Sequence, residues 1–129
     1  MIAVSDTSPL NYLALIGEIE LLPRIFTRVL IPPAVVSELH HARTPPVVAA
    51  WAANLPSWVD VVPPGQAFEE AALGRGESEA IAVALQVCAD VILIDERKAS
   101  VVARNHGLIV TGTLGVLDIA AVHPLAPGL

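Results

Sequence analysis

The sequence contains a single cysteine, Cys88, among its 129 residues. One thiol excludes an internal disulfide framework and a zinc site built from several cysteines. Charged side chains are also scarce, at 16% of the chain, whereas 54% of the residues are hydrophobic. A surface with so few charges leaves apolar area exposed, and we therefore expect it to be covered by a partner protein or by a second copy of the chain.

Basic residues are few. The chain has 7 Lys+Arg against 13 Asp+Glu, which gives a formal net charge of -6. This balance argues against a protein that holds nucleic acid by simple electrostatic attraction. It leaves open an enzyme that reaches nucleic acid through bound cations.

The sequence also lacks a hydrophobic run long enough for a membrane. A spanning helix needs about 20 uninterrupted apolar residues. The longest candidate, Ala80–Ile94, is interrupted by Gln86 and Asp90. The first residues contain neither a basic segment nor a cleavage site of the kind found in signal peptides. We therefore expect no membrane association and a cytoplasmic location.

Short aliphatic runs alternate with helical stretches along the chain, which is typical of βα units. We expect strands at Ile2–Ser5, Arg28–Ile31, Trp58–Val62, Val91–Ile94 and Leu108–Val110. We expect helices opened by Ser8 and Pro9, at Glu18–Phe26, after Pro32–Pro33, at Pro45–Asn54, from Gly76 to Ala89, at Glu96–His106 and from Thr113 onward. The length permits one domain, residues 1–129, and the pattern predicts an α/β fold whose parallel sheet is covered by helices on both faces.

Two of the predicted strands end in aspartate, at Asp6 and Asp95. In parallel sheets, functional groups gather beyond the carboxyl ends of the strands. Either aspartate could instead cap the helix that follows it. For Asp95 this alternative is serious, because a helix begins at the next residue, whereas Ser8 offers a cap that leaves Asp6 free.

Two glutamates are further candidates. Glu38 follows Pro32–Pro33 and lies at the edge of an apolar helical stripe, where a carboxylate is either solvated, paired or bound to a metal. Glu77 and Glu79 both lie in the first turn of a helix, where the helix dipole favours acids. Their side chains are about 200° apart. Glu79 is the better candidate to point inward, with a simple capping role as its alternative.

Four such acids in one pocket would repel one another unless a cation or a proton were present. Mg²⁺ and Mn²⁺ prefer carboxylate oxygens, and either can activate water and clamp a phosphodiester. An acidic protein with such a site can therefore cut a polyanion. The remaining residues are ordinary: Cys88 is expected to be buried, and Trp51 and Trp58 to serve as interface anchors or as packing around the third strand.

Five segments of the chain resemble the PIN-domain family, and in particular its prokaryotic VapC-like branch. They are Val4–Leu10, Ile31–Leu39, Gly76–Ala82, Leu93–Arg97 and Gly107–Gly115. The resemblance implies a Rossmann-like, three-layer fold with a sheet of about five strands in the order 3-2-1-4-5. It also implies a metal-dependent endoribonuclease, commonly the toxin of a toxin–antitoxin pair, neutralised by a cognate antitoxin and often a homodimer.

Within this resemblance, the acids Asp6, Glu38, Glu79 and Asp95 match the acidic quartet of the family. Asp6 and Asp95 would be the principal ligands of Mg²⁺ or Mn²⁺, and the two glutamates would bind the metal directly or through water. The resemblance and the loop positions add four possible RNA contacts: Ser8, Arg97, Lys98 and Thr113. For the two basic residues, a solvated helix face is the favoured interpretation.

Two other classes of function are open. The first is an inactive PIN-like domain that serves as a binding module, suggested by the scarcity of basic residues and by the ending His123–Leu129, because relatives usually continue for a further short segment. The second is a receiver-like phosphotransfer domain, which also places aspartates at strand ends. That class requires a lysine after the fifth strand, where this chain has Thr111–Thr113, and it ranks last.

Overall fold

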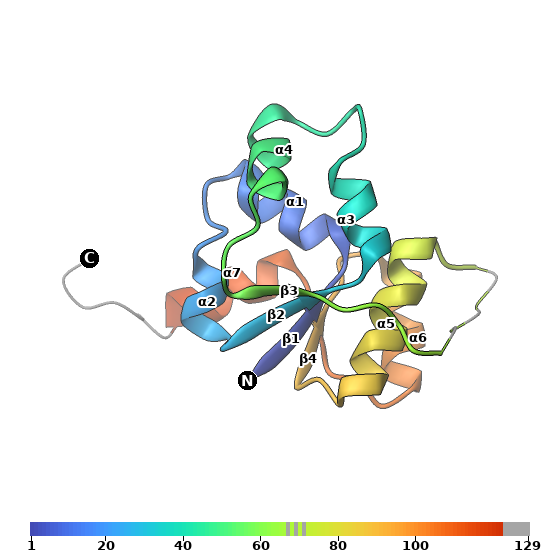
Figure 1. Ribbon diagram of the computed structural model, residues 1–129. Helices are drawn as coiled ribbons and strands as arrows, with labels where there is room; N and C mark the ends of the chain where they lie inside the picture. The colour runs from blue at the N-terminus through green and yellow to red at the C-terminus, as the bar shows by residue number, and fades with distance from the viewer. Residues whose placement is uncertain (67, 69, 71, 123–129) are drawn as a thin grey trace.

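The computed structural model describes residues 1–66, 68, 70 and 72–122 (Figure 1). The ending His123–Leu129 therefore lies outside the described residues. The strands are β1 (Ile2–Ser5), β2 (Arg28–Ile31), β3 (Val59–Val61), β4 (Val91–Leu93) and β5 (Val110–Thr111). The helices are α1 (Thr7–Leu15), α2 (Leu21–Ile25), α3 (Pro33–Leu39), α4 (Pro46–Ala53), α5 (Arg75–Val87), α6 (Arg97–Asn105) and α7 (Thr113–Val122).

The strands form one parallel sheet in the order β3-β2-β1-β4-β5, which confirms the predicted fold and strand order. The central strand β1 is paired on both sides, with Ala3 opposite Val29 of β2 and Val91 of β4. Because all strands run the same way, their carboxyl ends meet at one edge of the sheet. That edge receives the residues that follow β1 and β4, namely Asp6 and Asp95.

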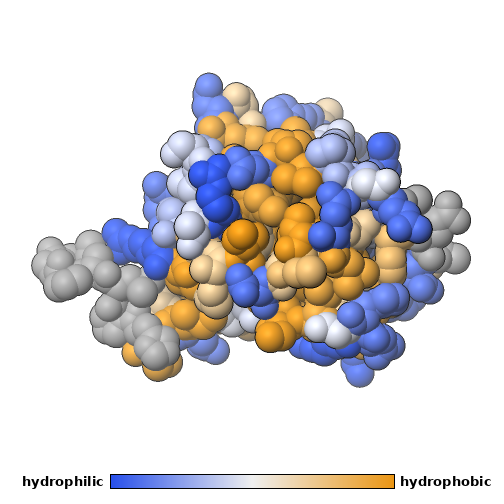
Figure 2. All heavy atoms as spheres, turned by 60° about the horizontal axis from the view of Figure 1, so that its bottom comes forward, coloured by the Kyte–Doolittle hydropathy of each residue, from blue (hydrophilic) through white to orange (hydrophobic). Residues whose placement is uncertain are grey.

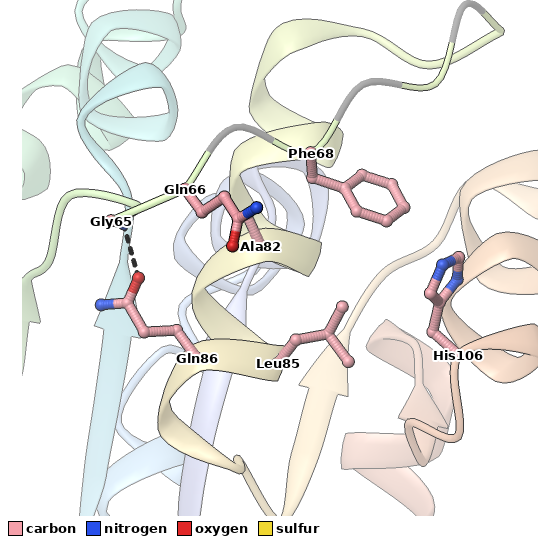
Figure 3. Close-up of a pocket in the computed structure, with 7 residues that line it drawn as sticks. All are labelled: Gly65, Gln66, Phe68, Ala82, Leu85, Gln86 and His106. Carbon is pink, nitrogen blue, oxygen red and sulfur yellow. Dashed lines mark hydrogen bonds between the residues drawn. The ribbon is translucent and has the colours of Figure 1, made fainter.

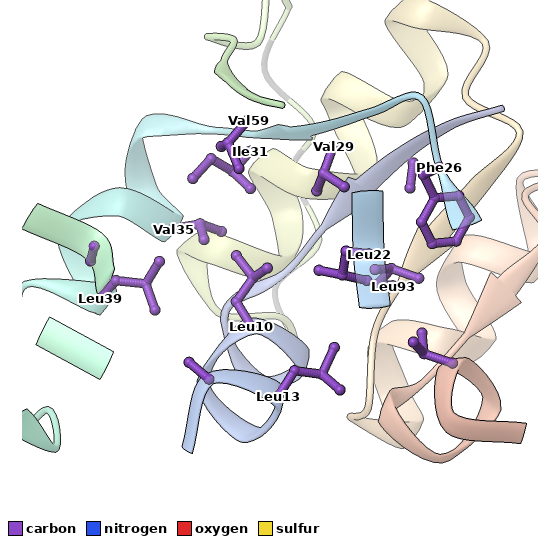
Figure 4. Close-up of a cluster of buried hydrophobic side chains, with 14 of the residues drawn as sticks. Leu10, Leu13, Leu22, Phe26, Val29, Ile31, Val35, Leu39, Val59 and Leu93 are labelled. Carbon is purple, nitrogen blue, oxygen red and sulfur yellow. The ribbon is translucent and has the colours of Figure 1, made fainter. Parts of the chain in front are cut away.

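Alternation of side chains along each strand divides the core into two layers. Ala3, Val29 and Leu93 face a layer built by α1, α2, α3, α4 and α7 (Figure 4). Val4 and Ile92 face the opposite layer, built by α5 and α6. Both faces of the sheet are thus covered, which explains why β1, β2 and β4 are mainly continuous aliphatic runs rather than alternating polar and apolar ones.

Several predicted boundaries differ from the structure. The first helix begins at Thr7, so that Asp6 and not Ser8 occupies the N-cap position. The expected helix Glu18–Phe26 is reduced to α2, which is five residues long. Of the two alternatives for the tryptophans, the structure shows packing near the third strand, with the rings of Trp51 and Trp58 6.2 Å apart between centroids.

The end of α5 also differs from the prediction. The helix ends at Val87, because Cys88 adopts a left-handed backbone conformation with φ of 52°. Cys88 is exposed, and the expectation of a buried thiol is wrong. Leu85 is also 36% exposed, so α5 is not buried on all sides.

Apolar surface is extensive, as the composition indicates. Figure 2 shows apolar side chains spread across the face that is turned forward from the bottom of Figure 1, where the N-terminus lies. Exposed apolar residues include Met1 and Ile2 at the start of β1 and Ile109 just before β5. Over the described part of the chain, no helix is both long enough and apolar enough to cross a membrane.

Candidate active site

Asp6 is the most buried acid near the carboxyl edge of the sheet, with 4% of its surface exposed. Its backbone N–H donates to the Leu93 carbonyl at 2.9 Å, which extends the β1–β4 pairing beyond the strand. Although it occupies the N-cap position, its side chain makes no capping hydrogen bond in α1. The carboxylate is thus held at the sheet edge without serving the helix.

Burial is the largest influence on the pKa of Asp6, which rises to about 7. The Thr7 backbone N–H acts in the opposite direction, and the nearby carboxylates of Glu77, Glu38 and Asp95 raise the pKa further. Three acids from three other parts of the chain therefore lie close enough for their charges to raise the pKa of Asp6. An anionic Asp6 is costly here unless positive charge is supplied.

Glu38 reaches this site from the last turn of α3. The Thr7 hydroxyl donates a hydrogen bond to its Oε2 atom, so the residue next to Asp6 holds this carboxylate in place. Gly76, in the first turn of α5, leaves the necessary room, because a Cβ atom there would lie 2.6 Å from Oε2 of Glu38. The starts of α1 and α5 and the end of α3 therefore converge beside Asp6.

Asp95 does not cap α6, so the capping role considered for it as an alternative is excluded. The next residue, Glu96, performs that role by accepting hydrogen bonds from the N–H groups of Lys98 and Ala99. Those two N–H groups lower the pKa of Glu96. Asp95 is left to accept from Thr113, whose N–H lies 2.7 Å from Oδ1 and whose hydroxyl lies 2.6 Å from Oδ2.

The first turn of α5 separates its two glutamates. Glu79, the predicted fourth acid, accepts hydrogen bonds from the Ala34 N–H and from Nε of Arg75, both at 3.1 Å. Glu77 accepts from the Gly74 N–H at 2.9 Å, and it is the carboxylate with the largest effect on Asp6. Glu79 thus tethers α3 to α5, while the charge of Glu77 acts on Asp6 and raises its pKa. Sequence reasoning weighed both and preferred Glu79.

The predicted RNA contacts are distributed differently. Thr113 belongs to the site through Asp95, and Ser8 is half-buried in the first turn of α1. Arg97 and Lys98 are exposed in the first turn of α6. Arg75, which sequence reasoning did not select, lies closer to the acids through its bond to Glu79.

The site is chemically suited to a divalent cation, because its donors are carboxylates gathered around a buried one. As the side chains stand in the described part of the chain, no three histidine, cysteine or acidic residues are arranged to hold a metal ion. Hydroxyl groups of Thr7 and Thr113 bind Glu38 and Asp95 instead. The fit to a metal thus rests on the donor chemistry and on the excess of negative charge.

A pocket of about 690 Å³ lies outside this group of carboxylates, beside α5 (Figure 3). Ala82, Leu85 and Gln86 of α5 line it, together with Phe68 and His106, whose rings meet edge to face at 4.9 Å. The residues that line it include no acid. On α5 the pocket runs from Ala82 to Gln86, so its nearer end is five residues beyond Glu77, about 7.5 Å along the helix.

The family model described as "PIN domain" matches residues 2–125, and the chain therefore belongs to the PIN-domain family. Members of this family are typically nucleases that use divalent metal ions. A solved structure of a PilT N-terminus domain protein from the hyperthermophilic archaeon Sulfolobus solfataricus is similar, with a TM-score of 0.69 and 18% identity. The match covers 95% of this chain and 96% of that one, and it shows a shared fold. No curated protein matches the chain.

Proposed function

We propose that the chain is a metal-dependent endoribonuclease of the PIN type and the toxin of a toxin–antitoxin pair. The observation that carries this proposal is the setting of Asp6, a buried carboxylate whose pKa is raised to about 7 amid three other acids. A protein gains nothing in stability from such an arrangement. The burial of Asp6 among other carboxylates is explained if a bound cation neutralises their charge.

In this proposal Asp6 and Asp95 are the principal ligands of Mg²⁺ or Mn²⁺. Glu38 and either Glu77 or Glu79 complete the acidic set, with Glu77 supported by its stronger effect on Asp6. The bound cation would lower the pKa of a water molecule and neutralise charge on the phosphodiester. The glutamates would orient that water, and Thr7 and Thr113 would keep Glu38 and Asp95 directed toward the site.

The assignment of RNA as substrate and of a toxin role rests on the VapC-like motifs. Exposed apolar surface, including Met1, Ile2 and Ile109, supports a protein partner such as an antitoxin or a second copy. An inactive binding module is the second candidate. It is favoured by the finding that, among the described residues, no three histidine, cysteine or acidic side chains are arranged to hold a metal ion.

The test is incubation of the purified chain with mixed-sequence single-stranded RNA in Mn²⁺, in Mg²⁺ and in EDTA. The proposal predicts internal cleavage in at least one metal and none in EDTA. Induced expression in bacterial cells should also arrest growth. Intact RNA in both metals, across several unrelated RNAs, together with normal growth, would favour the binding module.

A further inference from the structure

Arg75 differs from the other basic residues near the site in being anchored at one end and free at the other. Its Nε atom lies 3.1 Å from Oε2 of Glu79, while 79% of its side chain is exposed. Glu79 is in turn fixed by the Ala34 N–H at the start of α3. The guanidinium is therefore oriented by the fold before any ligand arrives, and an arginine ordered in advance loses little entropy when it binds an anion.

A pocket of about 250 Å³ lies beside this guanidinium, between α3 and the start of α5. It is lined by Ala34, Ser37, Glu38, His41 and Arg75. Glu38 connects the pocket to the candidate active site, because its carboxylate also accepts the hydrogen bond from Thr7. A chain of nucleotides that reaches the acids can therefore extend into this pocket.

The polar groups of the pocket are mainly hydrogen-bond donors. Arg75 contributes a guanidinium and Ser37 a hydroxyl. Nδ1 of His41 accepts the Arg43 N–H at 3.1 Å, so the ring hydrogen of the neutral imidazole is on Nε2. An arginine fork with neighbouring O–H and N–H donors is suited to phosphate oxygens. Glu38 is the one carboxylate among the lining residues, and its Oε2 atom is occupied by the Thr7 hydroxyl.

We propose that this pocket binds a backbone phosphate of single-stranded RNA next to the one that is cleaved, with Arg75 as its main contact. The inference rests on the proposed function, and it names a subsite for that substrate. A chain of net charge -6 needs a local cation to hold a polyanion beside an acidic site. Arg97 and Lys98, on the first turn of α6, would then contribute less to RNA binding than Arg75, or would not contact the RNA at all.

The test is binding of a fluorescein-labelled 12-nucleotide single-stranded RNA, measured by anisotropy in EDTA so that no cleavage is possible. Arg75→Gln is compared with Arg104→Gln, which removes the same charge from the exposed last turn of α6. We expect Arg75→Gln to weaken binding about tenfold, as for the loss of a bidentate phosphate contact. The slope of log K against log salt should fall by about 0.7, the value for one phosphate of a single strand.

Arg104→Gln should leave both quantities within about twofold of the wild-type chain, and thermal melting should confirm that each variant is folded. Arg75→Lys keeps the charge but not the fork and should fall between the two. Equal effects of Arg75→Gln and Arg104→Gln, or no measurable binding by the wild-type chain, would overturn the proposal. Because binding is read without metal, it is separate from the cleavage assay: RNA that binds through Arg75 in EDTA but stays intact in Mn²⁺ and Mg²⁺ would leave this inference standing and refute the nuclease.

Discussion

Thr113 binds both oxygens of Asp95, one through its backbone N–H and the other through its hydroxyl. Asp95 follows β4, whereas Thr113 is the first residue of α7, which follows β5. This pair fixes the carboxylate at the sheet edge and leaves the capping of α6 to Glu96. The strand-end aspartate is thereby available to the site rather than consumed by local structure.

Replacing Thr113 by valine should reduce metal-dependent RNA cleavage by about tenfold, because the loss of a hydrogen bond to a charged group costs about 1.5–3 kcal/mol. The backbone N–H bond would remain. Thr113→Ser, which keeps the hydroxyl, should retain most of the activity. Single-turnover rates for the three proteins measure the effect, and full activity in Thr113→Val would remove the hydroxyl from the account.

Gly76→Ala should disturb the site without unfolding the protein. A Cβ atom would come within 2.6 Å of the Glu38 carboxylate, and this exposed side chain would move away from Thr7. Gly74→Ala is the matched control, since its Cβ would meet only an ordinary contact at 3.5 Å. We expect cleavage to fall several-fold in Gly76→Ala alone, with similar melting temperatures for both variants. Equal activities would show that the position of Glu38 is unimportant.

The variants Glu77→Gln and Glu79→Gln should distinguish the roles of the two acids in the first turn of α5. If Glu77 serves the site, its variant loses affinity for Mn²⁺ and most of its cleavage activity. Glu79→Gln should mainly weaken the connection between α3 and α5, where it accepts from Ala34 and Arg75, at a cost of about 1–2 kcal/mol. Manganese titration and urea unfolding measure the two effects. The reverse pattern would return the role to Glu79, as the sequence motif predicts.

The metal-free protein should lose stability as the pH rises from about 4 to about 7. The pKa of Asp6 is raised from 3.8 to about 7 in the folded state. Between these values the native state keeps a proton that the unfolded state has released, so the free energy of unfolding falls with pH. The total decrease is on the order of a few kcal/mol, and it levels off above about pH 7.

Asp6→Asn should remove this pH-dependent component and be more stable than the wild-type chain at pH 8 in EDTA, but not at pH 4. Asp118→Asn, an exposed substitution on α7, should follow the wild-type curve. Urea unfolding across this pH range provides the comparison. Parallel curves for Asp6→Asn and the wild-type chain would contradict the raised pKa.

Much of the fold could be predicted from the sequence, because the short aliphatic runs of β1, β2 and β4 are largely buried parallel strands and each is followed by a helix. The strand-end positions of Asp6 and Asp95 also follow from that pattern. The capping of α6 could not be decided, because Asp95 and Glu96 are adjacent and only the three-dimensional structure shows which one bends back to the helix.

The orientation of α5 was likewise beyond sequence reasoning. Helical spacing shows that Glu77 and Glu79 point in different directions, but the rotation of the helix depends on its burial of Gly76 and Ala80 against its neighbours. The end of this helix depends on the left-handed conformation of Cys88, a residue type that carries no strong signal for it. Arg75 was missed because its bond to Glu79 became relevant only once α3 was placed beside α5.

The most direct test of the central claim compares Asp6→Asn with Asp118→Asn in the same assay, RNA cleavage at increasing Mn²⁺ with parallel calorimetric titration of the metal. The account predicts that Asp118→Asn cleaves and binds Mn²⁺ like the wild-type chain. Asp6→Asn should be folded, should bind Mn²⁺ at least tenfold more weakly and should leave the RNA intact. Wild-type cleavage and Mn²⁺ affinity in Asp6→Asn would contradict the account, because the Asp6 carboxylate would then be needed neither for metal binding nor for cleavage.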